Sequence, residues 1–187
     1  MKTISIKTVS LFILLGLLGF SASGYSQDRK LTRQERKEVR KTELQMNYYI
    51  LYSLLNVRAF VLQPDYLQNI YGERVPVTSN LNFIKVDRST GILQTGSLYD
   101  FGSNGVGSVT AEGTIDSWQI FKNDKKLSYV VHFSLSTNIG HYDVMLNVSF
   151  NTRATATING LYPGKLTWDG GLVTIDNSRV FKGQMTI

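Results

Sequence analysis

The chain has 187 residues, 42% of them apolar, with a formal net charge of +6 and no cysteine. That length suits one domain with a short extension. The lack of cysteine excludes disulfides, thiolate nucleophiles, thiolate-bound zinc or iron–sulfur sites, and a lipid anchor on an N-terminal cysteine.

The N-terminus has the layout of a secretory signal peptide. Two lysines precede an apolar run over residues 9–20, and small residues follow it. The run is shorter than the roughly 20 apolar residues that a membrane-spanning helix needs. We predict a signal peptide over residues 1–26 with cleavage after Ser26, and cleavage after Ser23 as the alternative. The mature protein is expected to be periplasmic or secreted, with no transmembrane segment.

Positive charge is concentrated just after the predicted signal peptide. Removing the two lysines of the signal leaves a charge of +4, and residues 28–43, with seven basic and four acidic groups, supply +3 of it. We expect residues 27–43 to form a charged, solvated helical arm. Because the basic charge belongs to this arm and the protein is expected to be exported, nucleic acid is not predicted as a partner. The basic residues are Arg29, Lys30, Arg33, Arg36, Lys37, Arg40 and Lys41.

The helix is expected to begin at a capping box, in which Thr32 and Glu35 take the N-cap and N3 positions. Its second half carries an apolar stripe at helical spacing, which predicts that this half docks on a single β-rich domain over residues 44–187. Asn56 is the predicted end of the helix. The stripe comprises Leu44, Tyr48, Leu51 and Leu55.

After the helix the apolar period changes to two, which is typical of β-strands. A first strand is predicted from Val57 to the residue before Pro64. Strands over residues 80–87 and 91–100 follow, joined by a turn.

A glycine cluster precedes a long strand that begins near residue 109. A dinucleotide or phosphate loop needs a helix after its glycines, so a strand there predicts a hairpin connection instead. The alternation changes phase further along this strand, which predicts a β-bulge near Asp116–Ser117. The glycines are Gly102, Gly105 and Gly107.

The clearest pattern is a hairpin formed by residues 127–136 and 141–150. If Ser136 faces His141 across the turn, then Leu135 faces Tyr142, and both apolar rows lie on one side. Another strand is predicted over residues 153–159, then a hairpin around Asp169–Gly171 and a last short strand over residues 179–187. The predicted fold is mainly β: an antiparallel β-barrel or strongly bent β-sandwich, a lipocalin-like meander of about eight or nine strands with one N-terminal helix.

The ionisable residues give no catalytic or metal pattern. In this register His132 faces Met145, and His132 and His141 lie about 13 Å apart along the strands, too far to share a metal. Glu112 and Asp116 have a similar separation, which is too long for a glycosidase pair. We therefore predict no catalytic, cofactor-binding or metal-ligating residue. Trp118 and Trp168 are interpreted as core anchors.

Several segments resemble family 4251 of the domains of unknown function. They are "NFIKVD", "ILQTG", "NGVGSVTAEGTI", the hairpin strands "YVVHFSL" and "YDVMLNVSF", "ATATI" and "LTWDGGL". The resemblance covers residue 44 to the C-terminus. It implies a small exported protein of Gram-negative bacteria with a charged helix and an all-β body. Many relatives look like lipoproteins, but this chain lacks the cysteine, so membrane anchoring is not carried over. The resemblance implies no catalytic residue.

Three functions remain open at this point. The first is a non-enzymatic binding module for a small apolar ligand, since barrels of this size can enclose one. The second is a protein-interaction or inhibitor-like module that uses a strand edge or the 102–107 loop toward another exported protein. The third is a periplasmic hydrolase whose carboxylates gather in a cleft with Glu112, Asp143 or His141.

Overall fold

The computed structural model of the chain describes residues 32–96, 109–161 and 164–185. The predicted signal peptide and the glycine cluster lie outside these residues. The chain divides into two units, Met1–Glu38 and Val39–Ile187. Helix α2 (Arg33–Val57) begins in the first unit and ends in the second.

The predicted capping box at the start of α2 is confirmed. The backbone N–H of Thr32 donates to Glu35 Oε2 (2.7 Å), and the backbone N–H of Glu35 donates to Thr32 Oγ1 (3.2 Å). These bonds, led by the one from the Thr32 backbone, lower the pKa of the Glu35 carboxyl from its ordinary value. The box supplies partners for backbone N–H groups that the first turn of any helix leaves free.

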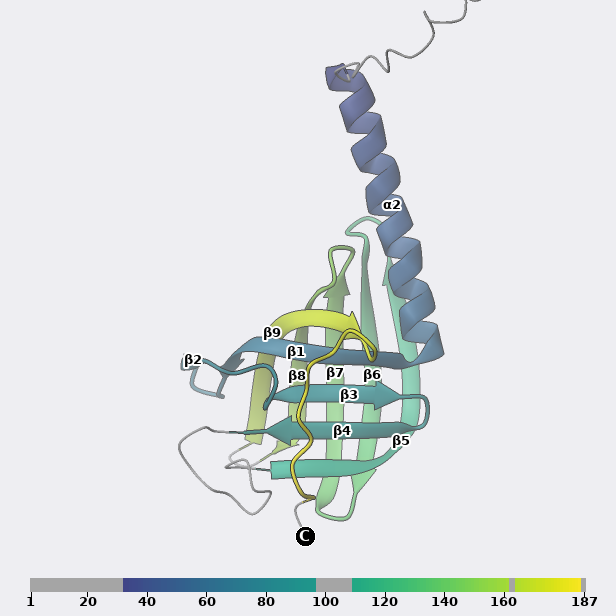
Figure 1. Cartoon of the computed structure of the whole chain (residues 1–187). Helices are drawn as coiled ribbons and strands as arrows, with labels where there is room; N and C mark the ends of the chain where they lie inside the picture. The colour runs from purple at the N-terminus through teal and green to yellow at the C-terminus, as the bar shows by residue number, and fades with distance from the viewer. Residues whose placement is uncertain (1–31, 97–108, 162–163, 186–187) are drawn as a thin grey trace, which may run out of the picture. The chain divides into compact units, whose positions relative to one another are not determined.

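The second unit is a closed antiparallel β-barrel (Figure 1). Strands β3 to β9 follow one another in sequence order, and β1 lies between β3 and β9, so that the β1–β9 pairing closes an eight-stranded barrel. The short strand β2 pairs antiparallel with the C-terminal residues of β1, Tyr66 to Gln68. Of the two predicted folds, barrel and sandwich, the structure is therefore the barrel. The strands are β1 (Ala59–Gln68), β2 (Arg74–Pro76), β3 (Phe83–Asp87), β4 (Thr90–Thr95), β5 (Val109–Asn123), β6 (Ser128–Thr137), β7 (Gly140–Ser149), β8 (Arg153–Leu161) and β9 (Gly164–Thr174).

The hairpin of β6 and β7 has the predicted register. Ser136 pairs with His141, Leu135 with Tyr142 and His132 with Met145. The ladder of β5 and β6 shifts between Ile115 and Trp118, which confirms the predicted bulge. The extra residue restores the inward position of apolar side chains after the alternation has changed phase.

Several predicted strand boundaries are wrong. The first strand begins at Ala59 rather than Val57, because α2 continues to Val57, and the strand predicted from residue 80 begins at Phe83. β1 continues through Pro64, where its ladder with β9 is irregular, and a bulge is one of the places where a strand tolerates proline. The hairpin expected around Asp169–Gly171 does not exist, because β9 runs straight through these residues. A Cβ on Gly170 would lie 2.0 Å from the Gln63 carbonyl oxygen, so this glycine serves a close approach of β1 rather than a turn.

The described part of the barrel interior is filled with side chains. Its inward residues come from every strand of the barrel, and many have no accessible surface, so they border neither solvent nor a water-sized void. Trp168 is fully buried and Trp118 packs against this core, as predicted for both. Core residues without exposed surface include Phe60, Leu62, Val86, Leu93, Val131, Ala156 and Ile158.

The second half of α2 docks through the predicted stripe. Tyr48, Leu51 and Leu55 are buried, while Leu44 is half-buried. The Tyr48 ring stacks on Tyr129 of β6 with 4.4 Å between centroids, and the Tyr129 hydroxyl donates to the Tyr48 carbonyl (3.1 Å). The helix ends at Val57, one residue beyond the prediction.

Residues 175–185, here called the C-terminal segment, cross the outer face of β3 and β4 without forming the strand expected over 179–187 (Figure 1). Beneath the segment, Val61, Phe83 and Ile92 form a second small apolar cluster. The sheet is thus buried on both sides here.

In the part of the chain that the structure describes, no helix has the length and apolar character needed to cross a membrane.

Candidate binding groove

An open groove of about 430 Å³ lies on the outer face of the barrel wall formed by β5 to β9. Most of its lining residues occupy outward positions on five neighbouring strands. Phe133 and Val144 are inward residues whose side chains belong to the core. The lining residues, here called the binding groove, are Ser117, Gln119, His132, Phe133, Ser134, Asp143, Val144, Met145, Thr157, Asn159 and Lys165.

A short hydrogen-bonded row orders one side of the groove. The Ser134 hydroxyl donates to the Asp143 carboxylate (2.9 Å) and lies 3.2 Å from the Ser117 hydroxyl oxygen. The row joins β5, β6 and β7 and holds the carboxylate in place. Asp143 retains acceptor capacity beyond this single bond, because a carboxylate offers about four lone-pair sites.

The other polar side chains of the groove have no hydrogen-bond or ion-pair partner among the described residues. Gln119 and Asn159 each present an amide with donors and an acceptor, and Lys165 presents an ammonium group. All three side chains belong to exposed residues. They come from β5, β8 and β9, so the groove gathers donors and acceptors that are far apart in the sequence.

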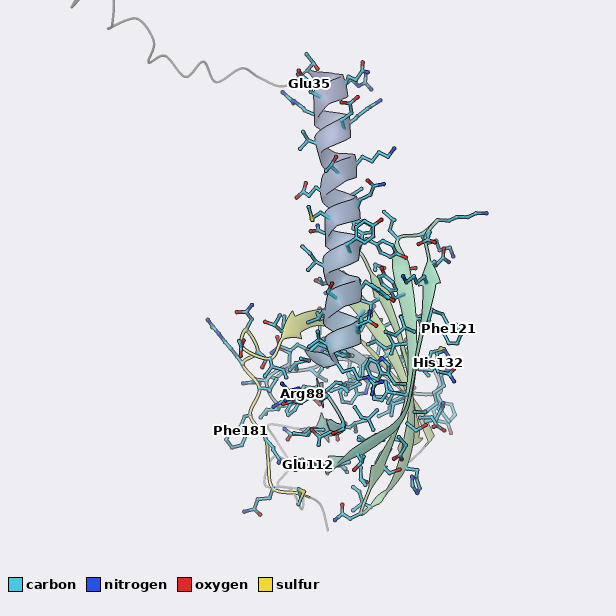
Figure 2. All side chains as sticks on the ribbon, turned by 90° about the vertical axis from the view of Figure 1, so that its right-hand side faces the viewer. Glu35, Arg88, Glu112, Phe121, His132 and Phe181 are labelled. Carbon is cyan, nitrogen blue, oxygen red and sulfur yellow. The ribbon has the colours of Figure 1, made fainter. Side chains whose placement is uncertain are left out.

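Aromatic and apolar groups lie at the rim. The Phe121 ring contacts His132 edge-on, with 5.5 Å between centroids, and Phe121 is 52% exposed. Figure 2 shows both rings on the outside of the sheet, pointing away from the barrel interior. Met145, opposite His132, adds a partly exposed thioether side chain. The rim therefore offers an apolar contact beside the polar row.

His141 lies in a second row next to the groove. The Ser136 hydroxyl is hydrogen-bonded to Asp116 and lies 2.8 Å from His141 Nδ1. Here serine stands between the acid and the imidazole, whereas a catalytic triad places the imidazole between serine and acid. His132 and His141 are both exposed, as predicted, and the described residues contain no cluster of three or more potential metal ligands.

Glu112 is not part of this surface. Its carboxylate forms an ion pair with Lys182 of the C-terminal segment. Figure 2 places Glu112 and Phe181 away from the side that carries Phe121 and His132. The structure therefore brings Asp143 into the groove and His141 beside it but leaves Glu112 elsewhere, and the carboxylate cleft expected of a hydrolase is not assembled from these three residues.

Three of the groove residues without a hydrogen-bond partner were not singled out by the sequence. Gln119, Asn159 and Lys165 sit at outward strand positions like many other polar residues. Only the combined register of the four successive hairpins from β5 to β9 brings them together, and the sequence predicted the register of the β6–β7 hairpin alone.

Comparison with known proteins identifies the family. The model of a family described as a domain of unknown function (DUF4251) matches residues 42–172. The chain belongs to the DUF4251 family. The crystal structure of a DUF4251 family protein from Bacteroides eggerthii DSM 20697, at 1.95 Å resolution, is similar to it, with a TM-score of 0.59. The two share 28% sequence identity over 73% of this chain and 93% of that chain. No curated protein matches this DUF4251 chain.

Proposed function

We propose that this DUF4251 protein is an exported, non-enzymatic binding module that holds a small polar ligand in the binding groove. The convergence of Gln119, Asn159 and Lys165 beside Asp143 carries this proposal. Ligand sites combine apolar contact with a few polar groups that fix orientation, and the groove offers both. One acidic and one basic side chain favour a neutral or zwitterionic ligand.

A polar ligand outside the barrel replaces the apolar ligand expected inside it. The described interior is occupied by side chains such as Leu93 and Trp168, which have no accessible surface. An apolar ligand would have to displace packed residues at a cost of several kcal/mol. The outer groove needs no such rearrangement.

Binding is measured by thermal unfolding with three probe sets at millimolar concentration: amino acids, dipeptides and hexoses. We expect one set to raise the Tm, because a ligand that binds only the folded state stabilises it. The double variant Asn159→Leu, Lys165→Met should lose this rise. Lys125→Met, which removes a lysine from the exposed turn between β5 and β6, is the matched control and should keep it.

Two results would contradict the groove assignment. One is a Tm that none of the three probe sets changes. The other is a rise that persists in the double variant. Dodecanoate is included as an apolar probe, and a rise with it in both the wild type and the double variant would place the ligand inside the barrel instead.

Export is tested on the same protein. The chain expressed in a Gram-negative bacterium should be found in the periplasm or medium with Gln27 as its first residue. A first residue of Gly24 would indicate the alternative cleavage, after Ser23. An unprocessed chain in the cytoplasm would refute the proposal of export.

The tip of the β1–β2 hairpin supports a second candidate, a protein-interaction module. Tyr71 is 80% exposed, Ile70 and Val75 are also exposed, and all residues of the edge strand β2 are exposed. Exposed apolar residues on an edge strand can add a strand from another protein. A Tyr71→Ser, Val75→Lys variant should then lose a partner captured from periplasmic extract, whereas the groove variant should retain it.

A further inference from the structure

The face of α2 that points away from the barrel carries a row of exposed apolar side chains. Val39, Met46, Ile50 and Val57 are each 54–62% exposed. Their spacing of seven, four and seven residues keeps them on one side of a helix, with Val39 and Met46 at heptad position d and Ile50 and Val57 at heptad position a. The buried residues Tyr48, Leu51 and Leu55 occupy the opposite side. The whole row lies in the second unit.

This row is self-complementary about the level of Tyr48 along the helix axis. A second helix laid antiparallel across a two-fold axis at that level places Met46 against Ile50 of the second copy, and Val39 against Val57. In an antiparallel helix pair, residues at heptad position d pack against residues at heptad position a of the other helix. This register does so in every apolar layer. A two-fold interface requires such self-complementarity, since each patch must meet its own copy.

The other residues on this exposed face of α2 fit the same register. Glu43 falls opposite Ser53 of the second copy, so the carboxylate in the row meets a hydroxyl rather than another charge. Asn47 and Tyr49 flank the axis, and Tyr49 is 66% exposed. A carboxylate inside the row disfavours burial of this face in lipid, where an unpaired charge is costly.

The size of the row suits a reversible dimer. The four side chains of the row and Tyr49, each more than half exposed, would bury about 500 Å² on each copy, or roughly 1,000 Å² in total, which is in the range of weak, transient interfaces. We propose that this DUF4251 protein forms a two-fold symmetric dimer through antiparallel pairing of α2 along Val39, Met46, Ile50 and Val57, with a dissociation constant in the micromolar range.

Sedimentation velocity tests the dimer on the full chain, expressed with its own N-terminal segment so that any processing occurs. We expect a concentration-dependent shift from monomer to dimer between about 1 and 500 μM. Ile50→Lys should raise the dissociation constant at least tenfold, because two lysines enter the apolar layers. Gln45→Lys adds the same charge at an exposed helical position off the row and should leave dimerisation unchanged. Circular dichroism confirms that both variants are folded.

Disulfide formation tests whether the two helices pair antiparallel. Because the chain has no native cysteine, each introduced cysteine is the single thiol of its copy. Met46→Cys mixed with Ile50→Cys should give a hetero-disulfide between two copies of different mass tag. Val39→Cys alone should stay reduced, since an antiparallel pair puts its two copies about 27 Å apart along the helix. A parallel pair would instead join Val39→Cys to itself.

Three outcomes would overturn the proposal. The first is a monomer at every concentration. The second is a Val39→Cys homodisulfide without the mixed product. The third is a protein that stays monomeric in solution but binds vesicles of phosphatidylethanolamine and phosphatidylglycerol in a manner that Ile50→Lys abolishes, which would assign the row to a lipid surface.

Discussion

Tyr129 shows how one buried residue links the helix to the barrel. Tyr129 is 1% exposed, and its phenol stacks on Tyr48 and donates a hydrogen bond to the backbone of α2. Burial, and then the hydrogen bond with Tyr48, raises the pKa of the Tyr129 phenol far above its ordinary value near 10. Burial likewise raises the pKa of Tyr48 and of Tyr142.

These shifts predict a loss of stability at alkaline pH. The folded state keeps phenol protons that the unfolded chain releases near pH 10, so the stabilisation is complete below about pH 10 and is lost as the pH rises toward the folded pKa. Urea unfolding between pH 9 and 11.5 should show a free energy of unfolding that falls with pH. Tyr129→Phe should reduce the slope by about 1.4 kcal/mol per pH unit. Tyr71→Phe, at an exposed tyrosine, is the matched control, and an equal slope in both variants would refute the assignment.

The period of two predicted the side of the sheet for many single residues. It placed His132 opposite Met145. It could not predict what Gln94 does, because the partners of this amide come from distant parts of the chain. A polar residue in the middle of a strand is indistinguishable by sequence from an exposed one, yet Gln94 is fully buried.

At the scale of elements, the C-terminal segment is the least predictable part of the fold. A strand was expected from residue 179 onward, but the segment has no regular secondary structure. It is held by a backbone hydrogen bond from the Phe181 N–H to the Asn80 carbonyl (2.8 Å) and by bonds to side chains. The Gln94 amide N–H groups donate to the carbonyls of Leu81 (3.0 Å) and Phe181 (2.8 Å). Its oxygen accepts from the Gly183 N–H (2.8 Å) and from the Thr110 hydroxyl (3.2 Å). One side chain thereby satisfies four polar groups.

Gln94→Leu should therefore release this segment. The variant leaves several groups without a partner near β4, and each buried unsatisfied group costs about 1–3 kcal/mol, so we expect a loss of about 3 kcal/mol in the free energy of unfolding. Hydrogen exchange should accelerate at Phe181 and Gly183. Gln119→Leu, which changes an exposed glutamine on β5, should lower stability by less than about 0.5 kcal/mol. An unchanged exchange rate at Gly183 in Gln94→Leu would show that the segment is held by other contacts.

Pairing between residues far apart in the sequence also explains the errors in strand boundaries. Pro64 and the pair Gly170–Gly171 carry strong turn signals, and local propensity supports a break at both. The structure overrides the signals because the two sites are paired to each other across the closing strands. Proline without an N–H and glycine without a side chain fit a place where two backbones come unusually close.

At the scale of the whole molecule, the barrel depends on the contact between β1 and β9. Gly170→Ala should destabilise the protein by about 3 kcal/mol, because its new methyl group would lie 2.0 Å from the Gln63 carbonyl oxygen and 2.5 Å from Pro64 Cα. Gly171→Ala is the matched control, since a Cβ there meets nothing within 4 Å. Chemical unfolding of both variants measures the difference in the free energy of unfolding. Equal stability would mean that the contact between β1 and β9 accommodates the methyl group.

The closing of the barrel by its first and last strands also sets the timing of folding. Phe60 pairs with Thr174, so the second neighbour of β1 lies 114 residues further along the chain. Pairings this distant in sequence slow folding, and unpaired edges invite wrong partners meanwhile. Before β9 is in place, β1 and β8 each keep an unpaired edge to which a strand of another chain can add.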